Sequence, residues 1–155
     1  MQARMKSPVL VFPNALKHLQ AVSKSLSEGG VPAKTLKLVD VRVSQINGCS
    51  LCLDMHNHEL RKLGEEDKRL FAIAAWREAP YFTAAERAAL ALGEAITRMS
   101  DREDPVPDAV WEEAARHYDE KGLATLVLAI AQINVWNRIN VPTRQPADGW
   151  RTLVA

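Results

Sequence analysis

The spacing of hydrophobic positions along the chain predicts helices. Leu36, Val39, Val43 and Ile46 recur at intervals of three and four residues, which places them on one face of a helix that Pro32 can open. The same stretch also alternates between hydrophobic and polar residues, as a strand does. We favour the helix because few other segments show a pattern that would supply partner strands.

Start and stop residues delimit the other expected helices. The run Thr83-Ala84-Ala85-Glu86 is a capping box, in which a hydroxyl and a carboxylate each satisfy a backbone N–H, and it starts a helix to about Met99. The sequence therefore predicts an all-α fold of about seven helices in a single domain over residues 1–155. The further helices are expected at residues 13–27, 50–63, 65–76, 107–118 and 122–139, with a polar turn over residues 100–107.

The last of these helices is apolar on most sides, so we expect it to be buried in the core or at a subunit interface. Pro142 and Pro146 follow it and predict an extended, irregular tail. Trp150 lies in that tail, where we expect it to pack against a neighbouring subunit.

Composition and charge narrow the class of protein. Lys and Arg number 20 against 19 Asp and Glu, with no long run of one sign, so neither nucleic acid nor a membrane is expected as the main partner. The beginning of the chain has no apolar stretch of signal-peptide length, and a cytoplasmic protein is expected. In that compartment a lone cysteine pair is more often catalytic or metal-binding than structural.

The candidate chemistry lies at the only two cysteines, Cys49 and Cys52, and at His56. Intervals of three and four residues place all three side chains on one face of the expected helix. Its first turn has unpaired N–H groups and the positive end of the helix dipole, which favour a thiolate. His56 can act as a base toward Cys52, one turn away.

A two-step reaction follows from this arrangement. One thiolate attacks an oxidant such as a hydroperoxide and becomes a sulfenic acid, and the other thiol condenses with it to give a disulfide and water. An external dithiol then reduces the pair by exchange. The spacing does not say which cysteine attacks first, but the neighbouring His56 favours Cys52 as the attacking and Cys49 as the resolving residue.

The run from Val43 to His56 resembles the signature of the AhpD-like alkylhydroperoxidases of the carboxymuconolactone decarboxylase family. The run from Ala131 to Ile139 resembles the end of that family's last core helix, and the resemblance spans about residues 32–144. It implies an all-α fold, homo-oligomers (commonly trimers or hexamers) and thiol-dependent peroxide reduction without metal, haem or flavin. It also implies peroxidatic Cys52, resolving Cys49, a proton relay that includes His56, and a lipoyl-bearing or thioredoxin-type protein as electron donor.

Two positions depart from the family. A relay glutamate usually stands twelve residues before the first cysteine, where this chain has Lys37, and a charged lysine cannot accept a proton. Three interpretations stay open: Lys37 stabilises a thiolate by its charge, Asp40 replaces the glutamate, or peroxidase activity is weak. Between the cysteines, Leu51 stands where the family commonly has His or Tyr, which removes a hydrogen-bond donor.

The same residues are compatible with other kinds of site. The thiols could be small buried hydrophobes, or Cys49, Cys52, His56 and His58 could bind zinc, although two histidines two residues apart on one helix face different directions. The protein could also be a redox sensor with little turnover, or a decarboxylase of the wider family. A decarboxylase needs an acid or base but no dithiol.

Overall fold

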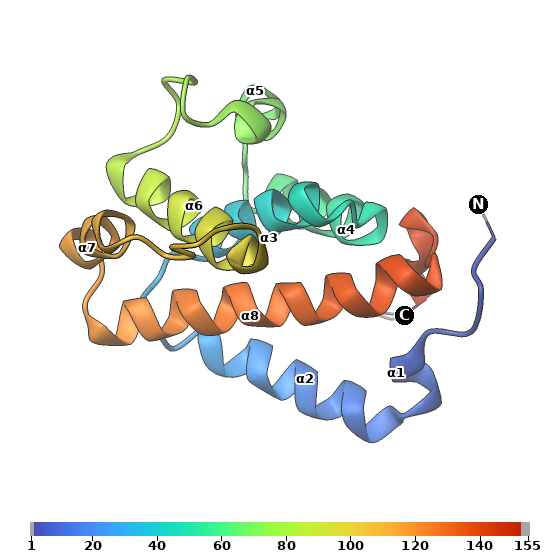
Figure 1. The fold of residues 1–155 in the computed structure, drawn as a ribbon. Coiled ribbons are helices and arrows are strands. Elements are labelled where there is room, and N and C mark those ends of the chain that lie inside the picture. The colour runs from blue at the N-terminus through green and yellow to red at the C-terminus, as the bar shows by residue number, and fades with distance from the viewer. Residues whose placement is uncertain (1, 153–155) are drawn as a thin grey trace.

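The computed structural model describes residues 2–152, which fold as an all-α protein without a strand in that range (Figure 1). This confirms the predicted fold class, and the described residues form eight α-helices where about seven were expected. The helices are α1 (Pro8–Val11), α2 (Pro13–Leu26), α3 (Ala33–Asn47), α4 (Ser50–Lys62), α5 (Asp67–Ala72), α6 (Ala84–Thr97), α7 (Asp108–His117) and α8 (Glu120–Thr143), with short 3₁₀ turns η1 (Ile73–Ala75), η2 (Met99–Asp101) and η3 (Ala147–Thr152).

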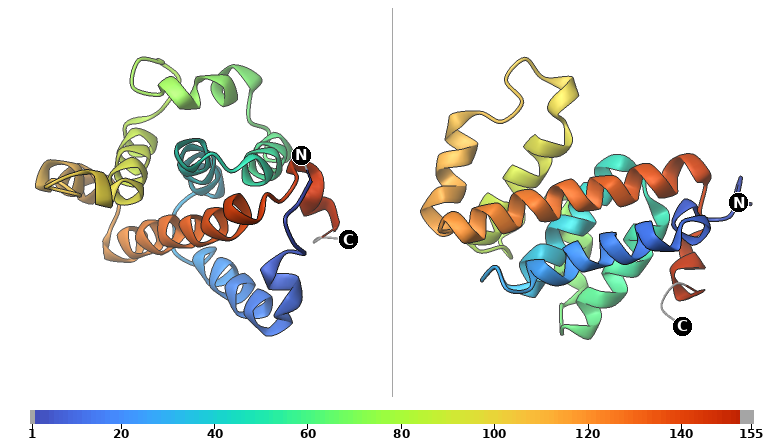
Figure 2. Two further views of the ribbon diagram at one scale, coloured as in Figure 1. Left: turned by 45° about the vertical axis from the view of Figure 1, so that its right-hand side comes forward. Right: turned by 90° about the horizontal axis from the view of Figure 1, so that it is seen from below.

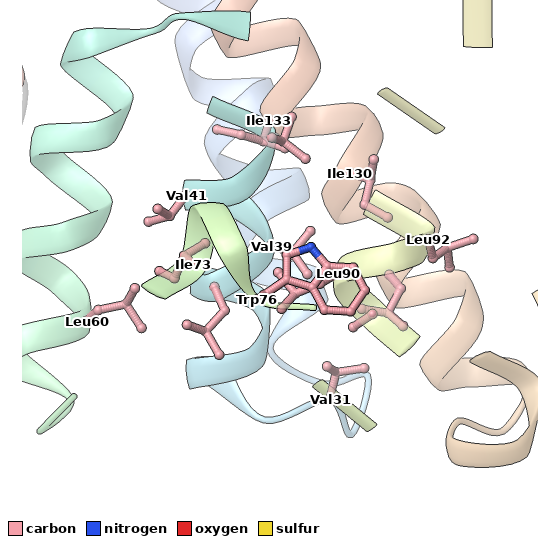
Figure 3. Close-up of a cluster of buried hydrophobic side chains, with 14 of the residues drawn as sticks. Val31, Val39, Val41, Leu60, Ile73, Trp76, Leu90, Leu92, Ile130 and Ile133 are labelled. Atoms are coloured by element: carbon pink, nitrogen blue, oxygen red, sulfur yellow. The ribbon is translucent and has the colours of Figure 1, made fainter. Parts of the chain in front are cut away.

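Helix α3 lies at the centre of the fold and packs against α4, α6 and α8. Its Val39, Val41 and Val43 are all buried because neighbouring helices enclose α3 on several sides. The alternation that resembled a strand therefore reflects burial on more than one face, and the helix prediction is confirmed. Figure 3 shows part of this core, where Val39 lies near Leu90 of α6 and Ile130 of α8.

Helix α8 runs between α2 on one side and α3, α4 and α6 on the other (Figures 1 and 2). By length and composition it could cross a membrane, but half of its most apolar 18-residue stretch is buried inside this fold. Buried amides join it to α3: Asn47 Nδ2 donates to the side-chain oxygens of Asn134 (3.0 Å) and Asn137 (2.8 Å). Asn137 Nδ2 in turn donates to Ser44 Oγ at 3.2 Å. These contacts identify α8 as a core helix of the fold.

The predicted end of this helix is wrong, because α8 continues through Pro142 to Thr143. Proline removes one helical N–H, but the next residue closes the turn: Thr143 Oγ1 donates to the carbonyl of Ile139 at 2.7 Å. Arg144 then adopts a left-handed conformation (φ 53°) and ends the helix. Because Pro142 lies one residue before Thr143, the last residue of α8, it reduces the stability of the helix little.

The tail is also not extended. Residues Ala147–Thr152 form the 3₁₀ turn η3, which packs against α4 of the same chain. Trp150 is buried there, its Nε1 donates to Asp54 Oδ2 at 2.5 Å, and its ring lies 5.1 Å from that of His58. The ring of Trp150 therefore packs within its own chain, and the expectation that it packs against a neighbouring subunit is wrong. Its polar Nε1 and flat face instead find partners on α4.

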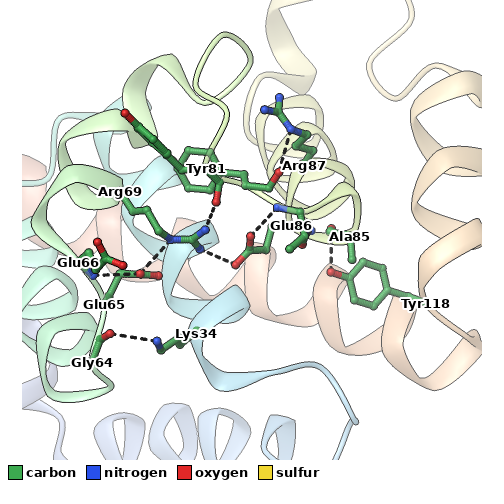
Figure 4. A network of polar contacts seen from close by, with 12 residues as sticks. Lys34, Gly64, Glu65, Glu66, Arg69, Tyr81, Ala85, Glu86, Arg87 and Tyr118 are labelled. Carbon is green, nitrogen blue, oxygen red and sulfur yellow. Dashed lines mark hydrogen bonds and ion pairs between the residues drawn. The ribbon is translucent and has the colours of Figure 1, made fainter.

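The helix expected at residues 65–76 divides into α5 and η1. The N–H of Glu65 closes the end of α4 by donating to the carbonyl of Leu60 at 3.0 Å, so the next helix starts only at Asp67. Arg69 then ties α5 to α6 by donating to Glu65 Oε1 (2.9 Å) and Glu86 Oε1 (2.6 Å), as Figure 4 shows. The predicted capping box at the start of α6 is confirmed.

Candidate active site

The turn between α3 and α4 places the cysteine motif. Gly48 ends α3 with a positive φ of 70°, a conformation that side-chain-bearing residues rarely adopt. Cys49 follows as the N-cap of α4, and its N–H donates to the carbonyl of Ser44 at 3.0 Å. Cys49 Sγ accepts from the N–H of Cys52 at 3.4 Å, so the first sulfur satisfies one of the unpaired N–H groups at the helix start.

In the structure Cys49 and Cys52 are joined as a disulfide, with their Cα atoms 5.4 Å apart. Each cysteine is only 1% exposed. Three residues on one helical turn thus bring the sulfurs within bonding distance, as the sequence predicted. Leu51, which stands between them, is also buried.

A cavity of about 450 Å³ lies beside the pair, between α2, α3, α4 and α8. Cys52 and His56 are among its lining residues, whereas Cys49 is not. Most of the wall is apolar, and the ionisable side chains gather where α3 and α4 meet. The residues that line it are Leu16, Gln20, Ser23, Leu26, Ser27, Val31, Ala33, Leu36, Lys37, Asp40, Leu51, Cys52, Met55, His56, Glu59, Ala129, Gln132, Ile133, Trp136 and Asn140.

The His56 ring is buried and held by Glu59, one turn further along α4. His56 Nδ1 lies 2.8 Å from Glu59 Oε2, and its other ring nitrogen, Nε2, is buried without a hydrogen-bond partner among the described residues. Burial would raise the pKa of Glu59, but the hydrogen bond with His56 and the charge of Lys37 outweigh it and lower that pKa to about 2. An ionised carboxylate can only accept, so the hydrogen is on Nδ1 and the lone pair of the neutral ring is on Nε2.

Lys37 of α3 bridges two carboxylates. Its Nζ lies 3.0 Å from Glu59 Oε2 and 3.2 Å from Asp40 Oδ2. Burial would lower the pKa of Lys37, but the charges of Asp40 and Glu59 together raise it, so the ammonium stays protonated. Asp40 Oδ2 is also 3.6 Å from His56 Nδ1, beyond ordinary hydrogen-bond length.

A donor from α8 reaches the second sulfur. Asn140 Nδ2 lies 3.6 Å from Cys52 Sγ, and the Asn140 side chain is buried. An amide N–H in this place can stabilise negative charge on sulfur. The sequence gave no sign of this residue, because nothing along the chain says that the end of α8 meets the start of α4.

Of the predicted site residues, the structure joins Cys49, the N-cap of α4, to Cys52 within that helix, and His56 of α4 lines the same cavity as Cys52. His58 instead lies against Trp150, so the four side chains of the zinc hypothesis do not converge. Within residues 2–152 no three His, Cys, Asp or Glu side chains are arranged to hold a metal. Glu59 was missed, although a carboxylate three residues after His56 on a helix was a readable signal.

A family model described as the carboxymuconolactone decarboxylase family matches residues 13–95. The uncharacterized protein YdfG of Bacillus subtilis (strain 168) is 38% identical over 131 residues, which cover 84% of this chain and 88% of YdfG. Residues 13–95 contain the cysteine motif, His56 and Glu59 of this chain.

Solved structures share the fold. A protein from Agrobacterium tumefaciens, of unknown function and with a suggested role as the antioxidant defence protein AhpD, superposes with a TM-score of 0.86 at 32% identity, covering 94% of this chain and 97% of its own. An uncharacterized peroxidase-related protein from Silicibacter sp. TM1040 has a TM-score of 0.74 at 23% identity, covering 84% and 69% of the two chains. The second likeness is one of fold.

Proposed function

Because the chain belongs to the carboxymuconolactone decarboxylase family and has an AhpD-like fold, we propose that it is a thiol-dependent alkylhydroperoxidase that serves antioxidant defence. One observation carries the proposal: a Cys49–Cys52 disulfide whose second cysteine lines a cavity together with His56. The suggested antioxidant role of the Agrobacterium protein supports it.

The cycle begins with the reduced pair. His56 Nε2 takes the proton of the Cys52 thiol, and the thiolate attacks the outer oxygen of a hydroperoxide, so that the O–O bond breaks. The alkoxide leaves with the proton from His56, and Cys52 becomes a sulfenic acid. The Cys49 thiol displaces water from it to form the disulfide, and an external dithiol restores both thiols while being oxidised to its own disulfide.

The cavity supports an organic rather than an inorganic peroxide. Its volume of about 450 Å³ is more than tenfold the roughly 30 Å³ that one water molecule occupies in the liquid. Its wall is apolar over most of its area, with Leu16, Leu26, Ile133 and Trp136 among the lining side chains, as suits a hydrophobic organic group. The electron donor is proposed to be a lipoyl-bearing or thioredoxin-type protein, and a trimer or hexamer in the cytoplasm stays a prediction.

The test is consumption of cumene hydroperoxide with dihydrolipoamide as reductant. With reductant, the wild type should turn over many equivalents and Cys52→Ser none. Without reductant, Cys49→Ser should consume about one equivalent, because its sulfenic acid then has no thiol with which to condense. If the wild type stops after one equivalent, the protein is a redox sensor and the enzymatic proposal is wrong. Full activity in Cys52→Ser would exclude thiol catalysis.

A further inference from the structure

A cluster of four charged or titratable side chains lies at the polar end of the cavity. Lys37 and Asp40 come from α3, and His56 and Glu59 from α4. Elsewhere on the wall, α2 and α8 contribute polar side chains that do not ionise, and Cys52 is the one further titratable lining residue. The protonation of the site is therefore governed by this cluster.

Within the cluster, Glu59 is the carboxylate that His56 uses. Its Oε2 is 2.8 Å from His56 Nδ1, whereas Asp40 Oδ2 is 3.6 Å away. Both His56 and Glu59 lie on α4 at a spacing of three residues, so the helix itself holds them together. Asp40 instead forms its closer contact with Lys37, at 3.2 Å.

We propose that Glu59 is a positioning residue for His56 in the thiol chemistry of Cys52, and that Lys37 positions Glu59. This inference rests on the proposed peroxidase function for its role in turnover, but the coupling of Glu59 to the thiol is independent of any substrate. Glu59 fixes the proton on Nδ1, which leaves Nε2 to accept the thiol proton, and then stabilises the imidazolium that results.

Lys37 sets the net charge of the cluster, because its ammonium contacts both carboxylates. One ammonium between two carboxylates leaves a single net negative charge beside the imidazole, and the Cys52 proton neutralises that charge when it arrives on His56. Without Lys37, Glu59 would bind a proton more readily and would lose one of the two contacts that orient it. A lysine at this position is therefore compatible with the chemistry.

The test uses Glu59→Gln and the matched change Asp40→Asn, each in the Cys49→Ser background so that one thiol titrates. The ultraviolet absorbance of the Cys52 thiolate is followed against pH in the reduced protein. Glu59→Gln should move the midpoint of thiolate formation to higher pH, because the contact at 2.8 Å stabilises the imidazolium more than the same charge repels the more distant thiolate. Asp40→Asn should move it much less.

Turnover is measured on the same substitutions with Cys49 intact. Since a positioned acid–base group contributes roughly 10²–10⁴-fold, Glu59→Gln should lower kcat about tenfold or more with little change in KM, and Asp40→Asn less than about threefold. The kcat of Lys37→Met should lie between those of Glu59→Gln and Asp40→Asn. Thermal melting checks that each variant is folded.

Equal effects of Glu59→Gln and Asp40→Asn on the thiolate midpoint, or no effect of Glu59→Gln, would overturn the inference. A wild type without hydroperoxide turnover whose thiolate midpoint still depends on Glu59 would refute the proposed function and leave the Glu59–His56–Cys52 coupling standing.

Discussion

Asn140 is the residue whose role follows most directly from a single contact. Its Nδ2 lies 3.6 Å from Cys52 Sγ, and it lines the cavity where a peroxide would meet that sulfur. A neutral donor beside the sulfur favours the thiolate and can also contact the alkoxide that leaves.

We predict that Asn140→Asp lowers kcat/KM for hydroperoxide by about tenfold or more, because a carboxylate of the same shape repels the thiolate. The matched control is Asn134→Asp, a buried amide of the same helix whose Oδ1 lies 2.7 Å from Arg138 Nη1, so a new negative charge finds a partner there. Steady-state kinetics on both variants decide the matter, and equal losses would contradict the role of Asn140.

The sequence identified the residues whose signal is local. The spacing of Cys49, Cys52 and His56 on one helix sufficed to place them together, and Glu59 could have been found by the same argument. Asn140 could not be found in this way, since it lies 88 residues from Cys52 in the chain and meets it only through the packing of α8 against α4. For Lys37, the sequence left three roles open, and its bridge to Asp40 and Glu59 became visible only with side-chain positions.

At the scale of elements, the turn between α3 and α4 sets where Cys49 begins the next helix. Gly48 has a φ of 70°, and a Cβ built on it would meet no atom within 4 Å, so the constraint is one of backbone conformation alone. Gly64 ends α4 in the same way, with a φ of 75° and the same open surroundings.

These two glycines form a matched pair. Gly48→Ala and Gly64→Ala should each reduce the free energy of unfolding by roughly 1 kcal/mol, the cost of a side chain in the left-handed region. Only Gly48→Ala should also slow peroxide turnover, because it shifts the start of the cysteine helix. Urea denaturation and kinetics measure the two effects, and a rate loss of the same size in Gly64→Ala would show that lost stability alone explains it.

The helices were predictable where periodicity and caps agree, as for α3 and α6. The end of α8 and the fold of the tail were not, because they depend on contacts between distant segments. Arg4 donates its N–H to the carbonyl of Thr143 at 2.9 Å, and Trp150 packs on Asp54 and His58 of α4. The general rule that a proline ends a helix takes no account of such contacts.

At the scale of the whole molecule, the cluster at the active site also affects stability. The pKa of Glu59 is about 2 in the folded protein and 4.5 in the unfolded chain, so its contribution is fully present above about pH 4.5 and is lost as the pH falls toward 2. Because the side chain is 38% exposed, solvent screening makes the contribution small.

We predict that wild type exceeds Glu59→Gln in free energy of unfolding at pH 6, and that the difference narrows between pH 4.5 and pH 2. Urea denaturation across this range measures it, with Glu28→Gln, an exposed carboxylate after α2, as control. A gap between wild type and Glu59→Gln that stays constant down to pH 2 would contradict the depressed pKa.

Oxidation of Cys52 Sγ by peroxide is the step on which the proposed function depends. Reduced Cys49→Ser protein is treated with one equivalent of cumene hydroperoxide, trapped with dimedone and analysed by mass spectrometry of its peptides. We expect a dimedone adduct of the sulfenic acid on Cys52 and one equivalent of cumyl alcohol. Unreacted Cys52 with the hydroperoxide left intact would contradict the proposed function.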